Sequence, residues 1–201
     1  MNFPEFFESA PRITVRDPLA RFLGAAEDGI IEYTYSDAVK LAGHSCPTVA
    51  SAYLMTRAAM RALYPAAFPE RGGIRVELRD DRLTGVAGVV ANVVSLLTGA
   101  SNDTGFKGIA GRFDRRCLLS FGADIPGQLR FTRQDTGTAA IVSARLERLP
   151  GDARITSLMP RCVAGTATAG QTAQFQSLWQ DRVRTLLVEH ADEPEIIVVQ
   201  H

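Results

Sequence analysis

The stretch Gly-His-Ser-Cys-Pro at residues 43–47 constrains the fold more than any other part of the chain. A proline inside a helix removes a backbone hydrogen bond and clashes with the preceding turn, but it suits the first helical position. We therefore expect a helix over residues 48–64 that begins at Pro47 and has Cys46 as its N-cap. Gly43 is expected to end a shorter helix before it, so that a loop joins the two.

Cys46 and His44 are the candidate functional residues of this stretch. The exposed N–H groups and the dipole at a helix N-terminus favour the thiolate, which is the nucleophilic and metal-binding form of cysteine. His44 lies in the entering loop, where its imidazole can reach the same point in space. The pair predicts a site but does not name a reaction, so the sequence leaves open whether the protein is an enzyme.

The remaining elements mix helices and strands without a strict alternation. Strands are expected at residues 13–15, 30–35, 74–78, 113–121, 128–133, 138–149 and 196–199, and further helices at residues 18–23, 37–42, 83–97, 155–163 and 168–190. Turn residues between the later strands favour antiparallel pairing. We predict an α+β fold, in which a mainly antiparallel sheet packs against helices, as a single domain over residues 1–201 with an N-terminal arm at about residues 1–12.

Composition and charge argue against several classes of partner. The chain has 22 basic and 22 acidic residues, so no overall field favours nucleic acid or an acidic membrane surface. Its start lacks a basic region followed by a long apolar run, and no stretch approaches the roughly 20 apolar residues of a membrane helix. The 3 cysteines include no Cys-x-x-Cys pair, which argues against a disulfide framework or a zinc ribbon. We expect a cytoplasmic protein with reduced thiols.

A second candidate region is the loop at residues 100–111, which is rich in glycine and small polar residues and follows the apolar helix expected before it. Such a loop lets the backbone approach a ligand closely. Asn102, Asp103 and Lys107 are the side chains that would contact a cofactor there. Asp103 and Lys107 suit a turn at least as well.

The Gly-His-Ser-Cys-Pro stretch, the alanine-rich helix after it, the Leu-Thr-Gly at residues 97–99 and the Gly-Phe-Lys-Gly at residues 105–108 resemble the formylmethanofuran dehydrogenase E-subunit family. The resemblance covers roughly residues 36–121. It implies an α+β core, a homodimer and a metal-associated cavity near the motif, with His44 and Cys46 as metal ligands and Lys107 in the cavity wall. A thiolate with an imidazole suits zinc first, with iron, copper or haem iron as alternatives.

Four positions depart from the pattern of that family. Thr48 stands where a glycine is usual, Ala42 where a histidine is frequent, Ala100 where a cysteine is common, and Asn92 where an aspartate is expected. The chain also lacks the zinc ribbon that many members carry. These departures imply that a shared fold and first ligand pair serve a different metal, ligand or substrate.

Three interpretations of the site therefore stay open. The first is a metal- or metallocofactor-binding protein, whose partner is a metal ion or a small-molecule ligand. The second is a cysteine-dependent enzyme with Cys46 as nucleophile and His44 as base. The third is an accessory interaction protein without chemistry of its own, in which the capped helix start is structural. Cys117, in an expected strand, and Cys162, near a helix end, are expected to be core residues.

Overall fold

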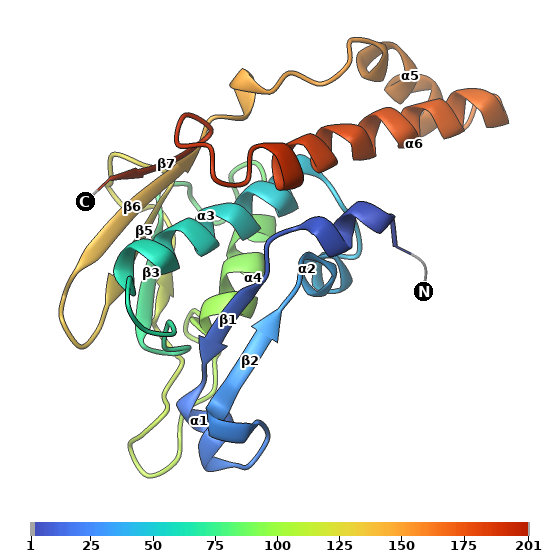
Figure 1. The fold of residues 1–201 in the computed structure, drawn as a ribbon. Helices are drawn as coiled ribbons and strands as arrows, with labels where there is room; N and C mark the ends of the chain where they lie inside the picture. Colours follow the sequence, from blue (N-terminus) through green and yellow to red (C-terminus); the bar gives the residue numbers. More distant parts are fainter. Residues whose placement is uncertain (1–2, 201) are drawn as a thin grey trace.

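A computed structural model of the chain describes residues 3–200, and its centre is a five-stranded sheet with the strand order β4-β3-β5-β6-β7 (Figure 1). The strands are β3 (Ile74–Leu78), β4 (Leu119–Ser120), β5 (Leu129–Arg133), β6 (Ala139–Ala144) and β7 (Ile197–Gln200). Neighbours among β3, β5, β6 and β7 pair antiparallel, and the short β4 runs parallel to β3. The predicted α+β fold, with a mainly antiparallel sheet packed against helices, is confirmed.

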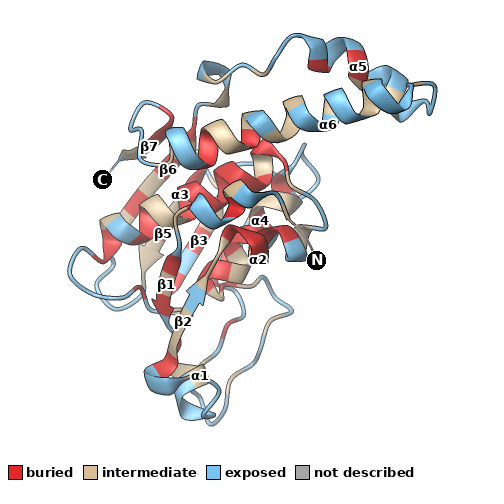
Figure 2. Cartoon of the chain, turned by 45° about the vertical axis from the view of Figure 1, so that its right-hand side comes forward, coloured by how far each residue is buried: buried red, intermediate tan, exposed pale blue. Residues whose placement is uncertain are grey.

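Helices α3 (Pro47–Leu63) and α4 (Ala87–Thr98) pack against the sheet (Figure 1). Residues along β3, β5 and β6 alternate between buried and more exposed, because one face of the sheet meets these helices and the other does not. Most of the 17 residues of α3 are buried, since this helix also contacts α4 and α2 (Tyr35–Ala42). Figure 2 shows α3 as the buried centre of the molecule.

A two-stranded antiparallel ribbon of β1 (Ile13–Arg16) and β2 (Ile30–Tyr33) extends away from the helices, with the short helix α1 (Pro18–Phe22) at its tip (Figure 1). Asp17 caps α1, because its carboxylate accepts hydrogen bonds from two backbone N–H groups at the start of the helix. The ribbon places this carboxylate next to the loops that precede β3 and β4, where it makes the ion pairs described below.

The predicted N-terminal arm lies against α2. Residues Glu5–Ser9 form a 3-10 turn whose Phe7 is buried. The ring of Phe7 meets that of Tyr35 edge to face, with the ring centroids 4.9 Å apart, and such aromatic pairs stabilise beyond the area they bury. Residues 1–2 of the arm lie outside the described residues.

The last third of the chain contributes α5 (Arg154–Val163) and α6 (Ala169–Arg184), which pack together and project from the body (Figures 1 and 2). The helix expected at residues 168–190 ends at Arg184, and a π turn at Thr185–Glu189 follows it. β7 then adds the predicted edge strand. Within residues 3–200, no helix has both the length and the apolar character that a membrane crossing requires.

Other predicted boundaries are wrong for identifiable reasons. Of the strand expected at residues 113–121, only β4 forms, because Phe113 and Cys117 have φ of +64° and +57°, which no strand accommodates. The helix expected from residue 83 starts at Ala87, since the chain first makes a turn with Gly85 at φ +49°. Ser36 is a favourable N-cap residue by sequence for the helix expected at residues 37–42, but the cap of α2 is Thr34, because a capping box with Asp37 forms there.

Candidate functional site

The Gly-His-Ser-Cys-Pro motif (residues 43–47) forms the connection between α2 and α3 that the sequence predicts. Gly43 ends α2 in the left-handed conformation, with φ +75°, which glycine adopts without strain. Cys46 is the extended N-cap residue of α3, and Pro47 is its first helical residue. The motif therefore places its thiol at the positive end of the most buried helix.

The two candidate ligands of the motif differ in their surroundings. Cys46 is 9% exposed, belongs to the core, and its thiol caps no N–H group of α3. His44 is exposed, and its Nδ1 lies 3.0 Å from the carbonyl oxygen of Ala42. In the tautomer that donates this hydrogen bond, the lone pair of His44 is on Nε2. The pair thus lies at the boundary between core and solvent.

Helix α6 holds the motif in place through Ser45. The indole Nε1 of Trp179 donates to the Ser45 carbonyl oxygen at 3.0 Å, and the Gln180 amide nitrogen donates to the same oxygen at 3.2 Å. The Ser45 hydroxyl donates to Gln180 Oε1 at 2.9 Å and lies 3.0 Å from the Tyr35 hydroxyl. Burial raises the pKa of Tyr35, so this hydroxyl stays protonated.

The sequence did not predict these contacts of α6 with Ser45, here called the clamp on Ser45, because Trp179 and Gln180 lie more than a hundred residues from Ser45. One signal was present in the sequence. The chain has 1 tryptophan, and a partly buried indole N–H generally needs an acceptor. The sequence did not show that the acceptor would belong to the motif.

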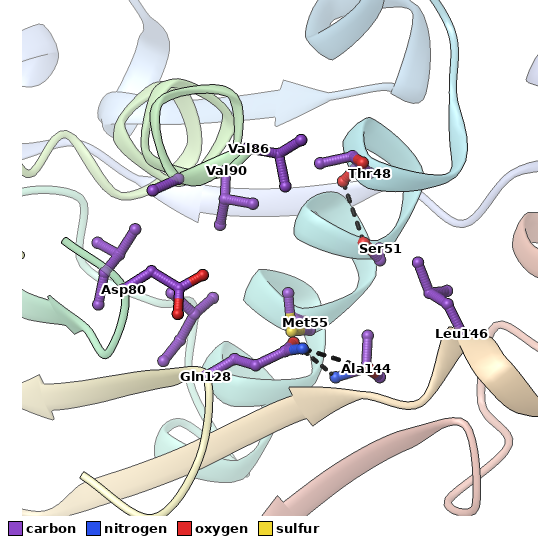
Figure 3. A pocket seen from close by; sticks show the side chains of 12 residues that line it. Thr48, Ser51, Met55, Asp80, Val86, Val90, Gln128, Ala144 and Leu146 are labelled. Atoms are coloured by element: carbon purple, nitrogen blue, oxygen red, sulfur yellow. Dashed lines mark hydrogen bonds between the residues drawn. The ribbon is translucent and has the colours of Figure 1, made fainter. Parts of the chain in front are cut away.

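A small cavity of about 120 Å³ lies beside the first turns of α3 (Figure 3). Its wall combines α3, the start of α4, the segment after β3, and residues at and near β5 and β6: Thr48, Ser51, Met55, Leu78, Asp80, Val86, Ala87, Val90, Gln128, Leu129, Ala144 and Leu146. Thr48 follows Cys46 by two residues, so the cavity begins within one helical turn of the motif.

Most polar groups of this cavity already have partners. Ser51 Oγ donates to the Thr48 carbonyl oxygen at 3.1 Å. The Gln128 amide accepts from the N–H of Ala144 at 3.0 Å and faces its carbonyl oxygen at 3.5 Å (Figure 3). Two side-chain groups therefore remain that a small ligand would meet between apolar walls. One is the Thr48 hydroxyl, and the other is the Asp80 carboxylate, whose one ion contact among residues 3–200 is with a neighbouring arginine at 3.9 Å.

The loop at residues 100–111 lines a different hollow. Asn102 and Asp103 face a space of about 530 Å³ together with Arg82 and Cys117. Asn102 Oδ1 accepts from the N–H and the hydroxyl of Thr104, which is the turn-stabilising role that competes with ligand binding. Lys107 is exposed. The structure thus does not bring these three residues to the cavity beside α3.

The expectation that Cys117 and Cys162 are core residues is wrong. Cys117 is exposed and Cys162 is partly exposed. Cys117 lies in a loop rather than a strand, because its backbone N–H is bound to the carbonyl oxygen of Asn102 at 2.6 Å and its φ is positive. Within residues 3–200, no group of three His, Cys, Asp or Glu side chains is arranged to hold a metal ion.

The structure defines an α+β protein in which Cys46, at the N-cap position of α3, and the exposed His44 flank Ser45, which α6 binds. A small cavity begins at Thr48, two residues after Cys46. Comparison of the chain with models of known protein families finds no match, and comparison with curated proteins finds none either.

Proposed function

We propose that the protein binds a transition-metal ion, or a small molecule that carries one, at the N-terminal end of α3, with His44 and Cys46 as protein ligands. The observation that carries this proposal is the orientation of His44. Metal-binding histidines usually donate one ring N–H to a carboxylate, a backbone carbonyl or water, and coordinate the metal with the other nitrogen. The contact between His44 Nδ1 and the Ala42 carbonyl oxygen matches the first half of that arrangement and leaves Nε2 as a ligand.

Cys46 supports the same proposal. Its sulfur lies at a helix N-terminus and makes no capping hydrogen bond, so a metal can bind it without breaking one. A thiolate and an imidazole suit zinc, and they also suit iron, copper and haem iron. Two protein ligands leave further coordination positions for water, for a small molecule that enters the cavity near Thr48, or for a second copy of the chain.

The resemblance of residues 36–121 to the formylmethanofuran dehydrogenase E-subunit family adds to this proposal, because the two ligands are the residues that the shared motif contains. We extend the proposal to a homodimer on the same resemblance. Sedimentation of the untagged protein with and without metal measures the oligomeric state, and a monomer under both conditions would contradict this extension.

Metal analysis of untagged protein, purified under reducing conditions without chelator, tests the proposal. We expect one equivalent of metal in the wild type and its loss in Cys46→Ser and in His44→Ala. Cys162→Ser and His190→Asn are matched controls, because they remove the same two chemical groups elsewhere in the chain. Wild-type protein without metal, or undiminished metal in Cys46→Ser, would refute the assignment. Circular dichroism shows whether each variant is folded.

A further inference from the structure

A buried ion cluster joins three segments that are distant in sequence. Asp17 precedes α1, Arg71 precedes β3 and Arg115 precedes β4. Nη1 of Arg71 lies 2.8 Å from Asp17 Oδ2, and Nη2 of Arg115 lies 2.8 Å from Asp17 Oδ1. The side chains of Asp17 and Arg115 are 5% and 7% exposed, so this cluster is largely removed from water.

The cluster contains one more positive charge than negative charge. Two guanidinium groups contact a single carboxylate, and arginine remains charged in proteins. In addition, Nη1 of Arg115 is buried and makes no hydrogen bond to any described residue. A buried charged donor without an acceptor is costly, and native structures rarely contain one without a reason.

Two glycines leave room for this guanidinium group. A Cβ atom at Gly72 or at Gly99 would overlap Nη1 of Arg115, and both residues have positive φ, at +88° and +71°. The backbone is therefore shaped around the Arg115 head group. Nη1 of Arg115, the nitrogen that does not contact Asp17, thus lies between the backbones of Gly72 and Gly99.

Arg71, Gly72 and Arg115 also line a polar hollow of about 460 Å³. Its basic residues are Arg71, Arg112 and Arg115. Arg112 makes no ion pair with any of residues 3–200, and its guanidinium lies 4.7 Å from the ring centroid of Phe113, which is also in the wall. Of the two acidic residues in the wall, Asp114 is already bound by Arg116 at 2.7 Å, and Glu70 is exposed.

We propose that this hollow binds the phosphate or carboxylate group of a small molecule, with the guanidinium groups of Arg71, Arg112 and Arg115 as its ligands. Guanidinium groups bind both kinds of oxyanion through paired, charge-assisted hydrogen bonds. Such an oxyanion balances the excess positive charge of the cluster. The ring of Phe113 offers an apolar surface for the rest of the molecule. This site is independent of the cavity beside α3.

Titration calorimetry of the full chain at low ionic strength, where charge interactions are weakly screened, tests the proposal with inorganic phosphate and with malonate as separate probes. We expect saturable binding of at least one probe, and the tighter of the two identifies the head group. Arg112→Gln is the informative variant, because Arg112 is exposed and its loss leaves the buried cluster intact. It should weaken binding at least about tenfold.

Arg75→Gln is the matched control, because Arg75 is an exposed arginine of β3 that does not line the hollow. It should weaken binding much less than Arg112→Gln does, because Arg75 does not line the hollow and cannot contact an anion bound there. Absence of saturable binding for both probes at millimolar concentration, or equal weakening in Arg112→Gln and Arg75→Gln, would overturn the proposal.

Discussion

Replacement of Asp17 by asparagine tests how strongly the buried ion cluster stabilises the fold. Asparagine keeps the size of the side chain and an oxygen that can cap α1, so the change removes mainly the charge. It leaves the guanidinium groups of Arg71 and Arg115 without a compensating carboxylate. Removing one partner of a buried pair costs about 3–5 kcal/mol. Because the Arg71 side chain is 23% exposed and retains some water, we expect a loss of about 3 kcal/mol, at the lower end of that range.

Urea unfolding at pH 7 measures this loss as the change in the free energy of unfolding. Asp135→Asn is the control, because Asp135 pairs with Arg133 at 2.6 Å while its side chain is 61% exposed. Exposed pairs of this kind contribute little to stability, because water screens them. We therefore expect Asp17→Asn to cost several times more than Asp135→Asn, with the same dependence on denaturant concentration in both variants.

The effect of Asp17 should also depend on pH in one direction. Burial opposes ionisation of its carboxyl group, but the hydrogen bonds from Arg71 and from the Ala20 N–H, with the charge of Arg115, outweigh burial, so its pKa lies below the ordinary value. Since the folded-state pKa is lowered, the stabilisation is present above the unfolded-state pKa and is lost as the pH falls through the folded-state pKa. The difference between wild type and Asp17→Asn should stay constant from pH 7 to about pH 5 and shrink below about pH 4.

Two outcomes would refute this reasoning. The first is a cost of Asp17→Asn no larger than that of Asp135→Asn, which would mean that water or rearrangement compensates the buried guanidinium groups. The second is a difference from wild type that does not change between pH 5 and strongly acidic conditions, which would mean that the charge of Asp17 is not its source.

The other predictions concern the cysteines and the glycines. Cys117, which is exposed, should react with iodoacetamide faster than Cys46, which is 9% exposed, as measured by mass spectrometry of tryptic peptides. Faster reaction of Cys46 in metal-free protein would instead support the interpretation of Cys46 as a nucleophile. Gly99→Ala should lower the free energy of unfolding by about 1–3 kcal/mol more than Gly43→Ala. Both glycines end a helix at positive φ, but only at Gly99 would the new Cβ meet Arg115, so equal losses in urea unfolding would contradict the packing argument.

The elements with local signals were predictable from sequence. Proline at the first helical position and glycine at the end of the preceding helix identify the start of α3 and the end of α2, and both were placed correctly. The alternating apolar residues of β3 predicted a half-buried strand with the right bounds. In each case a few neighbouring residues determine the backbone conformation, so no tertiary contact is needed to infer it.

The parts that could not be predicted depend on distant contacts or on backbone strain. Residues 113–118 were expected to belong to a strand, but hydrogen bonds to residues 101 and 102 hold them in a loop with positive φ at Cys117. The clamp on Ser45 joins residues 134 and 135 positions apart. The sequence likewise does not show that Arg71 and Arg115 share one carboxylate, that of Asp17, because this pairing depends on how three separate segments meet.

The contact between Trp179 and Ser45 allows the motif to be followed by tryptophan fluorescence. The chain has 1 tryptophan, and its indole N–H is bound to the loop that carries His44 and Cys46. Indole emission depends on hydrogen bonding and on local polarity, so an unlabelled solution of this protein already contains a spectroscopic reporter at the place where a metal is proposed to bind. Any event that shifts the Ser45 carbonyl should change the wavelength or intensity of that emission.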